Sequence, residues 1–146
     1  MVSVISAAIV AKKVVKNDFM YRGIILLGTN LGDKYGNLEL ALKELQEHLD
    51  IPRTSAIYQT PPWGYESSED YLNQALEFTT TLEPDAVMNL CLVTEKSMGR
   101  VRSGTGYTDR PIDIDILVID GVTSNTELLE VPHPRLHLRK FALMPL

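Results

Sequence analysis

The chain has 146 residues, enough for one domain that buries roughly 68–70% of its unfolded surface. Its formal net charge of −5 argues against a general nucleic-acid binder, which would carry a basic excess. The single cysteine, Cys91, excludes an internal disulfide framework and fits a small buried apolar residue. No apolar run reaches the roughly 18 residues of a membrane span, and the first lysines follow the N-terminal apolar stretch, the reverse of a secretory signal. We therefore expect a cytoplasmic protein that does not contact membranes.

The first half of the chain predicts a strand, a helix and two further strands. GIILLGTN at 23–30 is typical of a buried strand, ending in a turn at Gly28 to Gly32. Apolar residues at helical spacing predict a helix over 34–49, ending before Pro52. A short strand is expected in TSAIYQT (54–60) and a longer one in YLNQALEFTTTL (71–82). In the longer strand, one face carries Leu72, Leu76, Phe78 and Leu82, and the other carries Tyr71, Asn73 and Glu77.

The second half predicts a helix, a loop and a strand. Pro84 suits the first turn of a helix over 84–98, with Gly99 as its stop. A strand follows in RPIDIDILVID (110–120), then a turn at Gly121 and a short strand. The order of elements predicts an α+β fold of ferredoxin-like type, with a mostly antiparallel sheet covered by helices. We expect one domain over 21–146 and an N-terminal extension over 1–20 that could add a strand.

Two carboxylates stand near the beginning of the strand at 110–120. Strand alternation places Asp113 and Asp115 on one face together with Leu117 and Ile119, and the intervening residues on the other face. A half-solvated strand end would explain the acids, because charged residues are mostly exposed. The alternative is a pair of oxygen ligands for a divalent cation such as Mg²⁺, completed by substrate phosphates.

The loop before this strand is rich in arginine and glycine. GRVRSGTGYTDR (99–110) carries Arg100, Arg102 and Arg110 against a single acid, Asp109. Guanidinium groups bind phosphate oxygens through two hydrogen bonds, so these arginines fit a polyphosphate delivered with its metal. Scattered arginines on a solvated loop are the alternative reading.

Four stretches in a fixed order resemble a known enzyme family. They are GTNLGD (28–33), YQTPPWG (58–64), YLNQA (71–75), and GRVR followed by RPIDIDIL (99–117). With VPHPRLHLRKFALMPL (131–146), they make residues 23–146 similar to the 6-hydroxymethyl-7,8-dihydropterin pyrophosphokinases of folate biosynthesis. The resemblance implies transfer of the terminal diphosphate of ATP to a reduced pterin, with two Mg²⁺ ions.

The resemblance also implies roles for individual residues. It assigns the metal ions to Asp113 and Asp115, and a catalytic role to the loop arginines Arg100, Arg102 and Arg110. It implies that the nucleotide contacts Glu95, Arg102, Arg110, Ile116, His133 and Arg139. It implies that the pterin contacts Thr60, Pro61, Trp63, Tyr71, Asn73, Tyr107 and Phe141, with Tyr71 and Phe141 stacking on its two faces.

Each assignment has a plainer alternative. Tyr71 alone would be a surface aromatic of a strand, and Phe141 alone would be a core residue. His133 and His137 are four positions apart, but no third ligand near them in the sequence completes a zinc site.

The chain departs from the family pattern at a few positions. Leu92 replaces a glutamine, Tyr107 replaces a loop tryptophan, and Thr108 and Asp109 precede Arg110. These changes concern adenine binding and loop closure, and leave a non-catalytic pterin- or nucleotide-binding relative as an alternative function. A metal-dependent nucleotidyltransferase is disfavoured, because its Gly-Ser turn lies about a dozen residues before the aspartate pair, whereas Gly28 lies 85 positions before Asp113.

Overall fold

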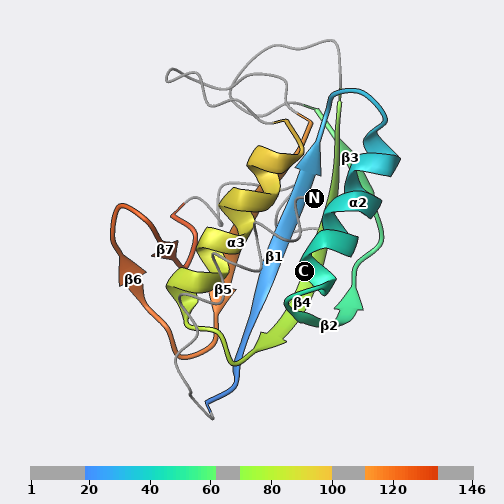
Figure 1. The fold of residues 1–146 in the computed structure, drawn as a ribbon. Coiled ribbons are helices and arrows are strands. Elements are labelled where there is room, and N and C mark those ends of the chain that lie inside the picture. Colours follow the sequence, from blue (N-terminus) through green and yellow to red (C-terminus); the bar gives the residue numbers. More distant parts are fainter. Residues whose placement is uncertain (1–18, 62–69, 100–110, 135–146) are drawn as a thin grey trace.

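Two helices lie on one face of an antiparallel sheet in the computed structural model of this chain (Figure 1). The structure describes residues 19–61, 70–99 and 111–134. The strands of the main sheet are β1 (Tyr21–Thr29), β2 (Asp50–Thr54), β3 (Tyr58–Thr60), β4 (Tyr71–Thr80) and β5 (Asp113–Ile119). The helices are α2 (Lys34–Gln46) and α3 (Pro84–Ser97), and β6 (Ser124–Asn125) pairs with β7 (Glu130–Val131) in a small second sheet.

The main sheet has the order β2-β4-β1-β5, with β3 also pairing with β4, and every pair is antiparallel. The predicted α+β fold is confirmed. One element was missed, because the residues after α2 form the short strand β2 and not merely the end of a helix. Pro52 is tolerated there because β2 is an edge of the described sheet and Pro52 lies within the register shift between Asp50 and Arg53, where it has no paired residue on β4.

Local sequence signals account for both helices. The side chain of Asp33 caps α2 by accepting a hydrogen bond from the Gly36 N–H at 3.1 Å. Pro84 begins α3, where its fixed φ suits a helix and its missing N–H costs nothing. Gly99 follows α3 with φ of 91°, a backbone conformation that glycine adopts most easily. The helix predicted over 34–49 ends earlier, at Gln46.

The main core lies between the helices and the sheet. Leu72, Leu76 and Phe78 of β4 are at most 5% exposed and belong to this core, as the alternating pattern predicted. Burying a side chain of this size contributes about 1.5–3 kcal/mol relative to leaving it exposed. α2 packs on β1 and β4, and α3 packs on β5 (Figure 1).

The other face of the sheet, which we call the open face, has a smaller apolar cluster. Leu26 of β1, Ala75 of β4 and Leu117 of β5 form it, and the half-buried Ile24 packs against it. These residues face away from the main core because side chains alternate along each strand. The cluster divides the open face into two polar ends.

The pairing of β1 with β5 contains a register shift between Ile24 and Ile25. Ile116 is opposite Ile25, but the next paired residue is Val118, opposite Ile24. The prediction that Ile119 shares a face with Asp113 and Asp115 is therefore wrong, since Ile119 belongs to the main core. An irregularity of this kind reverses the alternation of side chains along the rest of the strand.

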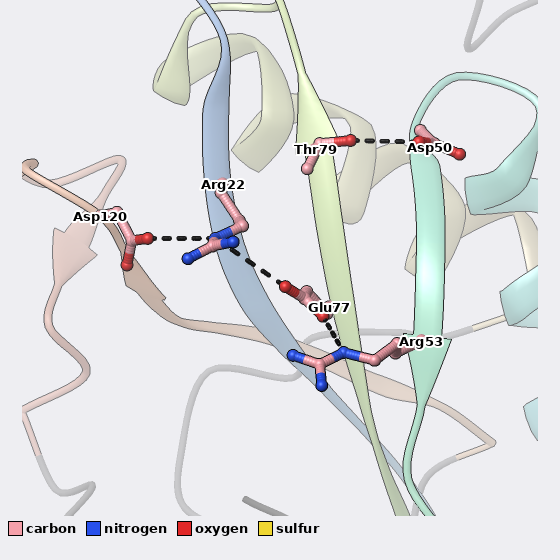
Figure 2. Close-up of polar contacts among 6 residues, drawn as sticks. All are labelled: Arg22, Asp50, Arg53, Glu77, Thr79 and Asp120. Atoms are coloured by element: carbon pink, nitrogen blue, oxygen red, sulfur yellow. Dashed lines mark hydrogen bonds and ion pairs between the residues drawn. The ribbon is translucent and has the colours of Figure 1, made fainter.

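One end of the open face carries a ladder of charges from neighbouring strands (Figure 2). Glu77 lies between Arg22 and Arg53, and Arg22 also pairs with Asp120 at 3.3 Å. Hydrogen bonding to Arg53 is the main cause that lowers the pKa of Glu77 below its ordinary value. The arginines are well exposed, so these ion pairs contribute little to stability.

None of the helices within the described residues is long and apolar enough to cross a membrane. Of the expected N-terminal extension over 1–20, which could add a strand, residues 1–18 lie outside the described part of the chain.

Candidate active site

The opposite end of the open face brings three sequence motifs into one row across three strands. Gly28 of β1 is the register partner of Asp113 on β5 and of Asn73 on β4. Directly opposed residues of antiparallel strands point their side chains to the same face. The row therefore places a carboxylate, a position without a side chain and an amide side by side.

The missing side chain at Gly28 leaves space beside an aromatic ring. A Cβ atom built on Gly28 would lie 3.5 Å from Cδ1 of Tyr71 and 3.4 Å from Oδ1 of Asn73. Both neighbours come from the beginning of β4. Tyr71 and Asn73 thus lie together at Gly28, as the sequence predicted for two residues on one strand face.

Asn73 is held firmly although its side chain is polar and only 1% of the residue is exposed. Its Nδ2 donates to Oγ1 of Thr60 at 2.8 Å and to the carbonyl of Tyr58 at 3.4 Å. These bonds satisfy the amide nitrogen, whose burial without partners would cost about 1–3 kcal/mol. They also fix the plane of the amide, so that Oδ1 lies toward Gly28.

Thr60 completes this side of the site. It is opposite Tyr71 in the pairing of β3 with β4, and its hydroxyl oxygen accepts the hydrogen bond from Asn73. Pro61 follows it and is exposed. The structure therefore brings Thr60, Tyr71 and Asn73 together from two neighbouring strands, as the resemblance implied.

Asp113 and Asp115 begin β5 on the open face, opposite Gly28 and Leu26 respectively. Both are half-buried, and strand alternation places both carboxylates on the same side. Among the described residues, no group of three or more His, Cys, Asp or Glu side chains could hold a metal ion. Two carboxylate ligands fit Mg²⁺, which keeps several waters and takes its other ligands from substrate phosphates.

Three further predicted residues lie at the outer edge of β5. Glu95 of α3 is 2% exposed, and its Oε2 accepts a hydrogen bond from the Ile114 N–H at 2.8 Å. Ile116 is 4% exposed, with its side chain in the main core, opposite in direction to Asp115. His133 is half-buried, and its backbone N–H donates to the Leu117 carbonyl at 2.7 Å.

Seven predicted site residues lie outside the described part of the chain. They are Trp63, Arg100, Arg102, Tyr107, Arg110, Arg139 and Phe141. Their roles stay predictions.

Cys91 is part of the main core and takes no place among these polar groups. It is 0% exposed, and burial raises the pKa of its thiol far above the ordinary value. The expectation of a structural cysteine is confirmed, because a buried thiol of this kind is inert.

This end of the sheet brings together two sets of groups, one on β5 and one on β4. One set is acidic and suits a cation with phosphates, and the other offers an aromatic ring with an oriented amide. Sites that recognise flat polar molecules combine apolar area with a few fixed polar groups in this way.

Comparison with known proteins identifies the family. Residues 24–146 match the sequence profile of the 7,8-dihydro-6-hydroxymethylpterin-pyrophosphokinase (HPPK) family. The chain is 39% identical over 124 residues to the 2-amino-4-hydroxy-6-hydroxymethyldihydropteridine pyrophosphokinase of Porphyromonas gingivalis, covering 82% of this chain and 84% of that protein. It is also 39% identical over 124 residues to the Bacillus subtilis enzyme of the same name, covering 84% and 74% of the two chains.

A plant protein shows the same likeness in a longer chain. The match to the folate synthesis bifunctional protein of Arabidopsis thaliana is 34% identical over 124 residues, 84% of this chain and 26% of the plant protein. The chain belongs to the HPPK family. The prediction of a pyrophosphokinase of folate biosynthesis is confirmed.

Sequence reasoning missed two residues of the site. Gly28 was assigned to a turn and to the GTNLGD motif but given no place in the site, whereas it lies within β1 in the middle of the row between Asp113 and Asn73. Thr29 was given no role, yet its hydroxyl donates to the carbonyl of Pro111, 82 positions away. The GTN motif marks both residues, but only the pairing of β1 with β4 and β5 shows what they contact.

Proposed function

We propose that the open face at Gly28 is where this chain carries out the reaction of its family. The row from Asp113 through Gly28 to Asn73 carries the proposal, because a carboxylate and an amide on either side of a glycine are what the two halves of such a site require. The hydroxymethyl oxygen of the pterin attacks the β-phosphorus of ATP, and the bond from that phosphorus to the α-phosphate oxygen breaks. AMP leaves, and the hydroxyl proton passes to solvent.

The pterin lies in the half formed by Tyr71 and Asn73. The ring of Tyr71 offers stacking area, and Oδ1 of Asn73 can accept a hydrogen bond from an amino or ring N–H of the pterin. Support comes from the two hydrogen bonds that fix the Asn73 amide and from the position of Tyr71 and Asn73 next to Gly28, which has no side chain. Phe141 would cover the second face of the ring, as the resemblance implies.

The ATP phosphates lie in the half formed by Asp113 and Asp115. Mg²⁺ held by these carboxylates would neutralise charge on the transferred phosphates. Through such ions, the carboxylates would hold the diphosphate end of ATP next to the pterin half, because the two halves adjoin at Gly28.

The remaining nucleotide contacts follow from the resemblance. Arg100, Arg102 and Arg110 would bind the phosphates, and His133 and Arg139 would hold the rest of the nucleotide. Ile116 contributes through its backbone, because strand alternation directs its N–H to the same outer edge as that of Ile114. The location in the cytoplasm stays a prediction.

The test is product analysis with ATP, Mg²⁺ and 6-hydroxymethyl-7,8-dihydropterin. The expected products are AMP and the diphosphorylated pterin in equal amounts. Release of pyrophosphate with a nucleotidylated pterin would show a nucleotidyltransferase. Binding of both substrates without either product would show a non-catalytic relative and refute the proposal.

A further inference from the structure

We propose that Thr29 and Glu95 are positioning residues that hold the beginning of β5 from two sides and so fix the direction of its carboxylates. The inference rests on the proposed function of Asp113 and Asp115 as metal ligands. Glu95 is buried and bonded to the protein backbone. This contact explains the burial of its carboxylate without a nucleotide.

The beginning of β5 requires such support because of its place in the sheet. In the order β2-β4-β1-β5, β5 is an edge strand: among the strands that the structure describes, β1 is its only neighbour in the main sheet. The outward N–H and carbonyl groups of an edge strand have no partner strand to fix them. A carboxylate pair on such a strand moves with its backbone, so the metal site is only as rigid as residues 111–115.

Glu95 acts on the outer edge. Its Oε2 accepts from the N–H of Ile114, the residue between the two aspartates, at 2.8 Å. Glu95 is 2% exposed and Ile114 is 1% exposed, so water does not compete for this bond. A buried hydrogen bond to an ionised acceptor contributes more than a neutral one, and it has a preferred direction. The contact ties β5 to α3.

Thr29 acts from the other side, at the end of β1. Its Oγ1 donates to the carbonyl of Pro111 at 2.5 Å and accepts from Nδ2 of Asn37 at 3.3 Å. The same Nδ2 donates to the Leu31 carbonyl at 2.8 Å, which ties the turn after β1 to α2. Thr29 is 0% exposed. This chain of bonds fixes the backbone two residues before Asp113.

Asp113 therefore lies between two held points, Pro111 and Ile114, each bonded by a side chain from a different element. Loss of either hydrogen bond would let the backbone around Asp113 change its orientation. The carboxylates of Asp113 and Asp115 would then no longer point in the same direction. Groups that orient metal ligands typically change metal affinity by 10–100-fold when they are removed. Removing either hydrogen bond should therefore weaken metal binding more than nucleotide binding.

The experiment measures Mn²⁺ binding to the full chain by electron paramagnetic resonance of the free ion. The nucleotide is an ATP analogue with a methylene bridge between the α- and β-phosphates, which cannot react. The variants Thr29→Val and Glu95→Ala each remove one hydrogen bond, and Thr29→Ser and Glu95→Gln each keep a group that can form it. Thr79→Val is the matched control, because it removes a hydroxyl bonded to Asp50 at the far end of the open face.

Thr29→Val and Glu95→Ala are expected to weaken Mn²⁺ binding about 10-fold, and the serine and glutamine variants to recover most of it. Binding of the analogue without metal should stay unchanged in the Thr29 and Thr79 variants, and Glu95→Ala should lose more metal affinity than metal-free nucleotide affinity. Unchanged Mn²⁺ affinity in both the valine and alanine variants would overturn the inference. So would equal losses of metal affinity and metal-free nucleotide affinity in Glu95→Ala, which would make Glu95 a nucleotide contact.

The controls separate this inference from the proposed function. An equal loss in Thr79→Val would assign the effect to general destabilisation and overturn the positioning role. AMP release by the unmutated chain tests the proposed function on its own. If AMP is formed and Mn²⁺ binds, a failure of the variants to respond concerns only Thr29 and Glu95.

Discussion

Replacing Gly28 by alanine should separate the stability of the fold from the binding of pterin. The backbone at Gly28 is not in the left-handed region, so alanine introduces no backbone strain. The new methyl group would lie 3.4 Å from Oδ1 of Asn73 and 3.5 Å from Cδ1 of Tyr71, close to ordinary contact distances. It would also project from the open face into the space where the pterin is proposed to lie.

The substitution should have opposite effects on the stability of the fold and on the affinity for pterin. Alanine in a strand interior is about 0.5–1 kcal/mol more favourable than glycine, so the free energy of unfolding should stay the same or rise slightly. The displaced pterin should lose its stacking on Tyr71, which for a nucleobase is worth about 1–3 kcal/mol. This corresponds to a roughly 5- to 150-fold weaker pterin affinity. ATP affinity should stay unchanged, because the carboxylate half is untouched.

Calorimetric titration of pterin into the complex with the unreactive ATP analogue, together with urea unfolding, measures both quantities. Gly23→Ala is the control on the same strand: its Cβ would lie 2.8 Å from the Phe78 ring and collide with the Val118 carbonyl. It should destabilise the fold strongly, whereas Gly28→Ala should not. A Gly28→Ala variant that folds and binds pterin with affinity within about twofold of the unmutated chain would refute the placement of the pterin.

Three further predictions concern the carboxylates, the loop and the charge ladder. Asp113→Ala or Asp115→Ala should abolish turnover while the fold remains, because removing one acid also relieves like-charge repulsion; steady-state rates within about threefold of normal would contradict the metal assignment. Arg100→Ala and Arg102→Ala should slow the chemical step in single-turnover kinetics more than they weaken ATP binding; loss of ATP binding alone would make the loop a passive clamp. Because its arginine partner lowers the pKa of folded Glu77, the pair contributes stability above the unfolded pKa of about 4.3, and this is lost as pH falls through the lower folded value. Glu77→Gln should therefore show a flatter acid dependence of the free energy of unfolding, and an unchanged slope would contradict the pairing.

Local patterns were sufficient for the parts of the fold in which one strand face is buried. Leu72, Leu76 and Phe78 recur at every second or fourth position, and only one face of β4 can satisfy them in the core. The direction of Asn73 followed from the same alternation. The shared direction of Asp113 and Asp115 also followed, because the irregularity in β5 lies beyond them.

Pairwise contacts between distant segments could not be predicted in the same way. Strand propensity disfavours Asn73, and only its bonds to Thr60 and the Tyr58 carbonyl explain how an amide is buried there. The contact of Thr29 with Pro111 depends on which strands are neighbours, and alternation along one strand carries no such information. The register shift was missed because residues 110–120 contain no glycine or proline at the irregular position.

The register shift explains how one short strand can serve both the site and the core. Strict alternation would leave Ile119 on the open face, where the neighbouring end of the sheet carries the charge ladder around Glu77. The shift returns Ile119 to the main core, while Leu117 still packs with Leu26 on the open face. Asp113 lies before the shift, in the regular part of the pairing, and so keeps its alignment with Gly28. The irregularity in β5 thus lies near Leu117, at the end of the strand that returns Ile119 to the main core. The end that carries Asp113 and Asp115 is paired regularly with β1.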